Sequence, residues 1–340
     1  MVGTGSCPST GRPTSTIPDP MSAHDARVVV VGSFNVDHVW TATRLPSTGE
    51  TLHGTYTSGP GGKGFNQAVA ATRAGVQTTF VCALGEDAGG QLARALATAD
   101  DIDLRDACSD QPTGTAGIHV DRQGRNSIVI GAGANAALSV DFVADQRDTI
   151  AAARVVLAQL ESPIAAIVHA LQLARDAGRI TVLNPAPADA GMHAALLALS
   201  DILTPNESEF SALLARHCNE RIEADRIAPM DDAQLHSLCR KLLPHGSAVV
   251  TLGAAGCFVS HAESDLHGDN DACYRVAAEA ANVIDTTGAG DAFNGALAAS
   301  LALRPAAAFR EHVAFATCYA ARSTEAAGAA SAMPRMTPRD

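Results

Sequence analysis

Residues 27–37 of the chain, RVVVVGSFNVD, open with a short β-branched run that Gly32 closes. Such a run is typical of a strand buried on both faces of a sheet, and it begins the part of the chain that we expect to fold. Similar runs recur at 78–84, 155–160, 180–183, 202–204 and 248–252. Alanine-rich, helix-like segments separate most of them. The alternation predicts an α/β fold in which helices cover both faces of a parallel sheet.

Polar or backbone-exposing residues follow most of these runs. They are Asn35, Asp37, Glu161, Asn184, Asn206 with Glu209, and Gly253. In open α/β sheets ligands bind outside the carboxyl ends of the strands, so we expect these residues to converge on one crevice. Taken singly, each could be a turn residue or a helix cap, which is the commoner role of Asn, Asp and Gly after a strand.

Two segments, 37–58 and 113–130, break this pattern because apolar and polar residues alternate in both. They carry β-formers such as Trp40 and Ile128, and a turn is expected at Gln123-Gly124. We interpret them as antiparallel strands that stand off the main sheet, over about 37–60 and 113–131. Such a sheet could be a lid that excludes water from the predicted crevice, or an ordinary surface hairpin.

The stretch DTTGAGDAFNG, residues 285–295, follows an apolar run that ends at Ile284 and leads into an apolar-periodic helix. The amides of Gly288, Ala289 and Gly290 should point outward at the helix N-terminus, where partial positive charge suits a phosphate. Asp291 is placed to accept a proton from an attacking hydroxyl. The stretch predicts phosphoryl transfer to an alcohol, with a simple helix cap as the alternative.

A second glycine-rich stretch, GGKGFNQ at 61–67, precedes another helix that should end near Gly75. Gly61 and Gly62 let the backbone approach a ligand closely, and Asn66 faces the same way from the first turn. Lys63 could contact that ligand or be a solvated lysine. The glycine spacing and the lack of a following Ser or Thr exclude a Walker A loop. Nor does Gly32 open a dinucleotide-binding fingerprint.

Composition narrows the function classes. The 340 residues carry a net charge of -12, which argues against a nucleic-acid partner. The eight cysteines show neither disulfide nor zinc spacing, and no apolar segment predicts a membrane span or signal peptide. Residues 1–26 are rich in Ser, Thr, Pro and Gly and predict a disordered tail. We expect a cytoplasmic protein.

Together these residues resemble the ribokinase-like (PfkB) carbohydrate kinase family over about 28–334. The resemblance rests on motifs in the expected order: GSFNVDH (32–38), GGKGFNQA (61–68), GAGANAAL (131–138), QLESP (159–163), NPAP (184–187), TPNESE (204–209) and 285–295. It implies a three-layer α/β/α kinase domain over 27–340, with a mostly parallel central sheet and a small β-sheet lid.

The activity that the resemblance implies is ATP-dependent phosphorylation of D-ribose at its 5-hydroxyl, giving ribose 5-phosphate and ADP. Asp291 would be the general base and the amides of Gly288–Gly290 the anion hole. A helix N-terminus should make Asp291 a weak base, which the loose transition state of phosphoryl transfer tolerates. The implied sugar ligands are Asn35, Asp37, Gly61, Gly62, Lys63, Asn66, Glu161 and Asp291. The implied nucleotide contacts are Asn206, Glu209, Thr251, Gly253 and Gly290.

The resemblance also implies Mg²⁺ with ATP, held through water by Glu209, and an activating K⁺ beside Asp285, Thr287 and Gly328. The sequence departs from the family at Ala332, where a serine ligand is common, and Ser331 comes one residue early. A homodimer through the lid is implied as well. Two alternatives remain: a kinase for deoxyribose, another sugar or adenosine, and a non-catalytic sugar or nucleotide sensor. Retention of Asp291, Asn206 and Glu209 argues against the sensor.

Overall fold

The structure of the protein is a computed structural model that describes residues 26–188 and 192–336. The tail predicted for 1–26 therefore lies outside the described residues except for Ala26, which is buried. In the described residues, no helix combines the length and the apolar character that a membrane span requires.

The main sheet has nine strands in the order β13-β12-β11-β10-β9-β8-β1-β4-β5, and all pairs from β11 to β5 are parallel. The antiparallel edge of β12 and β13, and the strand β5, were missed in the sequence. The mostly parallel sheet is confirmed. The strands are β1 (Arg27–Val31), β4 (Gln77–Gly85), β5 (Asp103–Ser109), β8 (Val155–Ala158), β9 (Ile180–Leu183), β10 (Ile202–Leu203), β11 (Ser247–Thr251), β12 (Cys257–Ser260) and β13 (Cys273–Val276).

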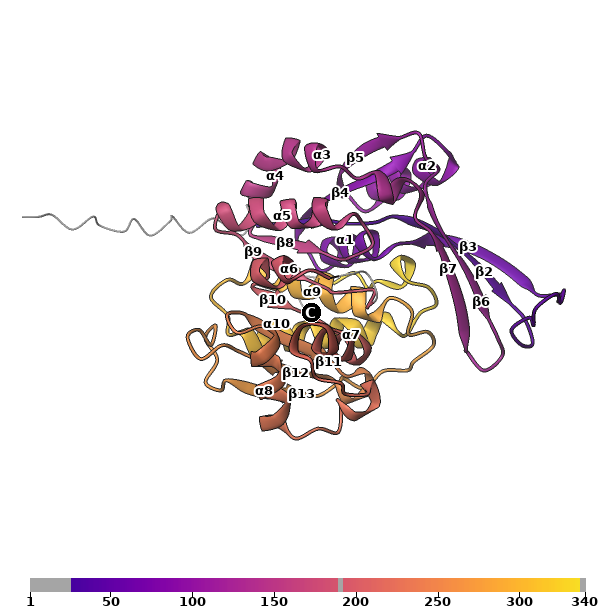
Figure 1. The fold of residues 1–340 in the computed structure, drawn as a ribbon. Helices are drawn as coiled ribbons and strands as arrows, with labels where there is room; N and C mark the ends of the chain where they lie inside the picture. Colours follow the sequence, from indigo (N-terminus) through magenta and orange to yellow (C-terminus); the bar gives the residue numbers. More distant parts are fainter. Residues whose placement is uncertain (1–25, 189–191, 337–340) are drawn as a thin grey trace, which may run out of the picture.

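Helices cover both faces of this sheet, as the buried valine run of β1 predicts (Figure 1). Val28 and Val30 join one apolar core with α1 (Lys63–Arg73), α2 (Ala88–Ala99), α9 (Ala289–Leu303) and α10 (Phe309–Ser323). Val29 and Val31 join the opposite core. Its helices are α3 (Val140–Asp145), α4 (Arg147–Ala152), α5 (Ile164–Asp176), α6 (Ala194–Leu199), α7 (Glu207–Leu213) and α8 (Asp232–Leu242). The predicted three layers are present.

Two helices of the first core, α1 and α9, pack unusually closely. A Cβ at Gly295 would lie 2.5 Å from the Cβ of Ala70, so only glycine permits this approach. The contact brings together the N-termini of the two helices that follow the glycine-rich stretches. Gly75 (φ 103°) lies just after α1, as predicted for its end.

The lid is a four-stranded sheet that projects from the body in the order β3-β2-β6-β7 (Figure 1). Two of its three strand pairs are antiparallel, as predicted, but the central pair of β2 and β6 is parallel. Both strands leave the main sheet in the same direction, and each is followed by its own antiparallel return strand. The turn at Gln123-Gly124 is confirmed by the Gly124 N–H, which donates to Asp121 O. The strands are β2 (Asn35–Thr41), β3 (Thr55–Gly61), β6 (Gly114–Val120) and β7 (Asn126–Gly131).

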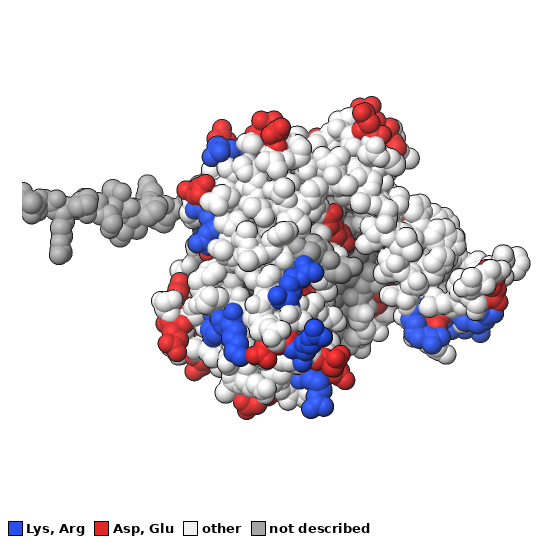
Figure 2. Space-filling view, viewed as in Figure 1, with Lys and Arg blue, Asp and Glu red and all other residues white. Residues whose placement is uncertain are grey.

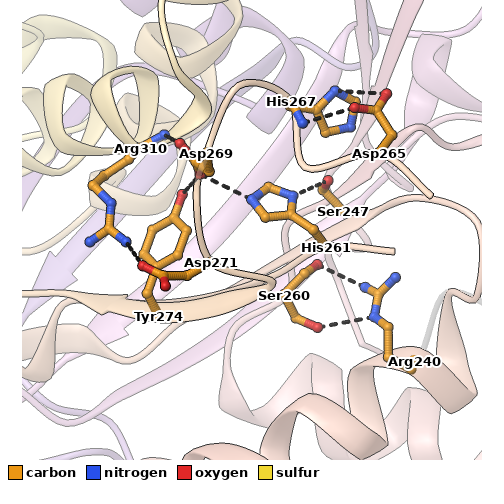
Figure 3. Close-up of polar contacts among 10 residues, drawn as sticks. All are labelled: Arg240, Ser247, Ser260, His261, Asp265, His267, Asp269, Asp271, Tyr274 and Arg310. Carbon is orange, nitrogen blue, oxygen red and sulfur yellow. Dashed lines mark hydrogen bonds and ion pairs between the residues drawn. The ribbon is translucent and has the colours of Figure 1, made fainter. Parts of the chain in front are cut away.

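A buried polar cluster, here named the edge cluster, ties the antiparallel edge of the sheet to α10 (Figure 3). His261 pairs through Nδ1 with Ser247 Oγ at 2.7 Å and through Nε2 with Asp269 Oδ2 at 3.1 Å. Tyr274 Oη also donates to Asp269, and so does the Arg310 backbone N–H, at 3.0 Å. His261 and the Asp269 carboxylate are no more than 1% exposed, so this Ser-His-Asp arrangement is closed to substrates.

The apolar pair Val283 and Ile284, which precedes the 285–295 stretch, is not part of a strand. Both side chains lie on an irregular loop and are 62% and 69% exposed. The apolar run in the sequence therefore does not mark a core element. It marks an exposed apolar edge next to the glycine-rich turn.

Candidate active site

Asp291 lies in the first turn of α9 and is 7% exposed. Gly288 caps the helix with φ 77°, a conformation that favours glycine. Each carboxylate oxygen of Asp291 accepts one amide hydrogen bond: Oδ2 from Asn66 Nδ2 and Oδ1 from Gln67 Nε2, both at 2.9 Å. The close packing of α1 on α9 therefore presents two amides of one helix to the carboxylate of the other.

The backbone around Asp291 offers donors to an anion. The Ala289 N–H donates to Thr286 O at 3.2 Å. In the described part of the chain, the N–H groups of Gly288, Gly290 and Asp291 have no acceptor. These free donors lie at the positive end of a 15-residue helix, which suits a phosphate.

Three carboxylates interact with a single lysine at this site, and a fourth, Asp37, interacts with two of them. Burial raises the pKa of Asp37 to about 6, and the charges of Glu161 and Asp291 add to the rise. For Lys63, burial acts to lower the pKa, but Asp291, Glu161 and Glu209 together raise it. Lys63 therefore stays charged and is the counterion of the group. In Figure 2 the surface is hollowed where the lid leaves the body, and acidic side chains lie in that hollow.

Burial also raises the pKa of Asp291, against the opposing effects of Lys63 and of the two amides. This differs from the expectation that the helix N-terminus would make it a weak base. The carboxylate is enclosed, so loss of hydration outweighs the helix dipole. A raised pKa makes Asp291 a better proton acceptor than an exposed aspartate.

The predicted sugar ligands lie together between the lid and α1. A Cβ at Gly61 would come within 2.2 Å of Asp37 Oδ2, and Gly62 adopts φ 87°. Glu161 Oε2 accepts hydrogen bonds from Ser33 Oγ at 2.6 Å and from the Lys63 N–H at 3.0 Å. Gly61 therefore brings the backbone directly against the Asp37 carboxylate, and the Lys63 N–H contacts Glu161.

Asn35 and Asn66 complete this group. Asn35 Oδ1 accepts from Asn135 Nδ2 at 2.8 Å, and Asn135 also pairs with both backbone groups of Phe34. Asn66 Oδ1 is buried and has no hydrogen-bond partner among the described residues. A buried acceptor without a partner costs free energy, so it indicates a place for a ligand hydroxyl.

Asn206 and Glu209 form a capping box at the start of α7. Glu209 Oε2 accepts from the Asn206 N–H at 2.9 Å, and Asn206 Oδ1 accepts from the Glu209 N–H at 2.8 Å. Burial raises the pKa of Glu209. Thr251 lies beside Asn206 through a backbone bridge, whereas Gly253 is exposed on a short 3₁₀ turn, where a Cβ would meet no atom within 4 Å. One side-chain oxygen of each capping residue thus serves α7, which leaves Glu209 Oε1 and Asn206 Nδ2 to solvent or ligand.

The predicted cation residues also lie together. Asp285 Oδ1 accepts from the Thr287 N–H and Oγ1, and its Oδ2 accepts from the Gly328 N–H at 2.9 Å. Burial acts to raise the pKa of Asp285, but these donors lower it overall, so the carboxylate stays ionised. A Cβ at Gly328 would lie 2.4 Å from Ser331 Oγ, whereas Ala332 offers no side-chain oxygen. An ionised carboxylate between two loops fits a monovalent cation.

A divalent metal has no ready-made cage. Among residues 26–188 and 192–336, no group of three or more His, Cys, Asp or Glu side chains could hold a metal ion. The site chemistry fits Mg²⁺ that arrives with nucleotide phosphates and keeps its waters.

Three residues that support the site were not assigned from the sequence: Ser33, Gln67 and Asn135. All three lie within quoted motifs, but their partners are distant in sequence, as for Gln67 and Asp291. Spacing along the chain offers no signal for such contacts.

Cavity volume alone does not mark this site. A surface depression of about 930 Å³ lies elsewhere and is lined by Arg221, Ile222, Glu223, Asp225, Arg226, Pro229, Met230, Asp231 and Gln234. It shares no residue with the group around Asp291, and its basic and acidic side chains are mixed. We therefore assign the functional site from its chemistry.

Comparison with known proteins places these observations in a family context. A model of the pfkB family of carbohydrate kinases matches residues 25–336. Ribokinase of Mus musculus is 39% identical over 319 residues, which cover 91% of this chain and 92% of that protein. The solved structure of ribokinase from Giardia lamblia superposes with a TM-score of 0.80 at 28% identity, covering 92% of this chain and 96% of that chain. Ribokinase of Arabidopsis thaliana, solved with ribose and ATP, gives 0.75 at 31% identity, covering 91% and 95%.

Proposed function

Because this chain belongs to the pfkB family of carbohydrate kinases, we propose that it transfers the γ-phosphoryl group of ATP to the 5-hydroxyl of D-ribose. The products are ribose 5-phosphate and ADP. The observation that carries the proposal is the buried Asp291 carboxylate, which lies beside free helix N-terminal amides and the unpartnered Asn66 Oδ1. The proposed base, the amides that would bind the phosphoryl group and a free hydrogen-bond acceptor for the sugar therefore lie beside one another. The relatives named ribokinase support ribose as the acceptor.

In this mechanism Asp291 accepts the proton of the attacking hydroxyl. The amides of Gly288 and Gly290, with that of Asp291 itself, stabilise the charge on the transferring phosphoryl group. Lys63 offsets the repulsion among the site carboxylates and the phosphate. Mg²⁺ bound with ATP would neutralise charge on the phosphates. Glu209 would hold its waters.

The sugar is held by groups on α1, the lid and the loop after β8. Asp37 and Asn66 bind ring hydroxyls, because a carboxylate or an amide can pair with neighbouring hydroxyls and reject analogues that lack them. Because Gly61 and Gly62 have no side chains, the backbone at these positions leaves room for the sugar ring. Supporting contacts come from Asn35, Lys63 and Glu161.

The nucleotide lies across α7 and the end of β11. Asn206, Thr251 and Gly290 are its proposed contacts, and Gly253 contributes through the exposed turn at its edge. The bridge between Asn206 and Thr251 supports this assignment, because it brings two of these positions side by side.

A monovalent cation such as K⁺ binds beside Asp285, with backbone groups of Thr287 and Gly328. Ser331 Oγ lies close to Gly328. This supports a site in which Ser331 replaces the serine ligand that the family commonly has at the position of Ala332. Replacing Ser331 with alanine should therefore weaken K⁺ activation.

The lid supports a further assignment, a homodimer. Ile128, Val129 and Ile130 on β7 are exposed, which favours pairing with the lid of a second copy. Sedimentation of the Val129→Glu variant as a monomer would support this homodimer.

We also propose a cytoplasmic location, since the proposed reaction consumes ATP.

The test is release of ADP from Mg-ATP with ribose, deoxyribose, fructose or adenosine, with and without K⁺. Strong turnover of ribose alone supports the proposal. Turnover of only another acceptor would change the substrate and keep the mechanism.

A binding assay distinguishes the sensor alternative. Lys63 and Lys241 are the lysines of this chain, and Lys241 is an exposed partner of Glu220. Ribose and ATP should protect Lys63 but not Lys241 from reductive methylation. Protection without any turnover would favour a sensor.

A further inference from the structure

A chain of buried hydrogen bonds begins at the proposed base and leads away from it. Gln67 Nε2 donates both to Asp291 Oδ1 at 2.9 Å and to Asn184 Oδ1 at 3.1 Å. Asn184 Nδ2 in turn donates to the backbone O of Thr204 at 3.1 Å. The chain therefore crosses from α1 to the carboxyl ends of β9 and then β10.

The same chain returns to the anion donors. Thr204 Oγ1 donates to Asn294 Oδ1, and Asn294 Nδ2 donates to Gly290 O at 2.8 Å. Gly290 is the covalent neighbour of Asp291. The hydrogen bonds and the backbone thus close a ring that starts at the carboxylate and ends at the peptide beside it.

The side chains that link the ring are buried, and the direction of their hydrogen bonds is fixed. Gln67, Asn184, Thr204 and Asn294 are all between 0% and 6% exposed. Gln159 Nε2 donates to Gln67 Oε1 at 2.6 Å, so the Gln67 amide can offer only its nitrogen to Asp291. Each remaining member donates to the next. No amide in the ring can therefore rotate without losing two hydrogen bonds.

We propose that this ring is the positioning element of the active site, in which Gln67, Thr204 and Asn294 fix the Asp291 carboxylate relative to the Gly290 peptide. The inference rests on the proposed phosphoryl transfer. Proton acceptance and phosphate stabilisation require the base and the anion donors to keep one mutual geometry, and small misplacements are costly. None of the three side chains has to contact a substrate for this role. Thr204 also lies two residues before Asn206, so the nucleotide element is tied to the same ring.

Thr204→Val tests the link that is farthest from the substrates, because valine keeps the shape and removes the hydroxyl. We expect kcat to fall by roughly ten- to a hundredfold while both KM values stay within about twofold. Thr204→Ser restores the hydroxyl and should recover most of kcat. Thr181→Val is the matched control: Thr181 Oγ1 is equally buried on β9 but bonds Asp201 and Leu199 O, outside the ring. It should lower thermal stability and leave kcat unchanged.

Gln67→Met gives a second readout in case Thr204→Val does not fold. Without this amide, Asp291 keeps Asn66 and Lys63 as stabilising partners and still faces Glu161, while Asp37 and Glu209 lie nearby. Its pKa should rise, so the acid limb of the kcat profile should move to higher pH.

The outcomes separate the inference from the proposed function. Absence of turnover in the wild-type chain with every acceptor would refute the proposed function itself. With an active wild type, an unchanged kcat in Thr204→Val beside a lower melting temperature would show that the ring only stabilises the fold. A rise in KM at constant kcat, or an unmoved acid limb in Gln67→Met, would likewise overturn the positioning role.

Discussion

The active site and the edge cluster both bury a carboxylate among polar side chains, but they differ in what is left unpaired. In the edge cluster, Asp269 accepts three hydrogen bonds and both ring nitrogens of His261 have partners. Around Asp291, the acceptor Asn66 Oδ1 and the N–H of Gly290 have none among the described residues. A saturated network holds elements together, whereas open hydrogen-bonding positions await a ligand.

The two regions also differ in how burial acts on their charges. Burial lowers the pKa of His261, although Asp269 opposes the shift, so the edge cluster carries a neutral histidine beside one carboxylate. In the active site, burial raises the pKa of Asp37 to about 6, and the charges of Glu161 and Asp291 add to the rise. The edge cluster is complete in the free protein. The active site retains repulsion that a ligand and its counterions can relieve.

Asp291→Asn should have the largest effect on function. Loss of the base should lower kcat by roughly 10²–10⁴-fold, while the melting temperature holds or rises because a buried charge is removed. The measurement pairs ADP release with thermal unfolding. Near-wild-type turnover in this variant would mean that the open cluster around Asp291 is not catalytic.

Asp269→Ala should lower the stability of the fold and leave turnover unchanged, the reverse of Asp291→Asn. Three donors lose their acceptor, so we expect the free energy of unfolding in urea to fall by about 3 kcal/mol. For the protein that remains folded, kcat should be unchanged. Asp265→Ala is the control, because Asp265 is an exposed partner of His267 and its loss should cost less than about 0.5 kcal/mol. A fall in kcat without a fall in stability would give the edge cluster a catalytic role.

Asn66→Leu should reduce the stabilisation that ribose provides. In the wild-type chain, ribose at a hundred times its Kd should add about 2.7 kcal/mol to the free energy of unfolding. The variant lacks the open acceptor, so its Kd should rise about tenfold, equivalent to about 1.4 kcal/mol. Titration calorimetry measures the change. Asp269→Ala should retain the full ribose-dependent increment, and an equal loss in both variants would erase the distinction between the clusters.

The sequence predicts most of the fold because a strand buried on both faces of a sheet requires a continuous run of apolar residues, which can be recognised locally in the sequence. The valines of β1 alternate between the two cores, and the runs for β4 and β11 are of the same kind. The edge strands β12 (CFVS) and β13 (CYRV) contain one β-branched residue each and so lack the β-branched run of β1, and the parallel pairing of β2 with β6 depends on where distant segments leave the sheet. Position after a strand likewise predicts Asp37 and Glu161. The ring also joins residues far apart in the sequence, such as Thr204 and Asn294, which no local spacing relates.

The smallest predicted effect is a difference in pH dependence between the clusters. The pKa of Asp37 is about 6 in the folded protein against a reference of 3.8, so the folded state binds its proton more tightly. Its contribution to stability is therefore present below about pH 4 and lost as pH rises through about 6. The pKa of His261 is lowered from 6.5, so its contribution is present above that pH and lost as pH falls. The two slopes have opposite signs.

Urea unfolding of Asp37→Asn and His261→Gln between about pH 4 and 8 separates these slopes. Asp37→Asn should lose less stability than the wild type as pH rises from 4 to 7, because the cost of burying the Asp37 charge and its repulsion with Glu161 and Asp291 are gone. His261→Gln should lose less stability as pH falls below 6.5. Parallel curves for Asp37→Asn and the wild type would mean that the free site holds no repulsion among its carboxylates. Ribose binding would then gain free energy only from the open hydrogen-bonding positions, and none from relief of repulsion among the carboxylates.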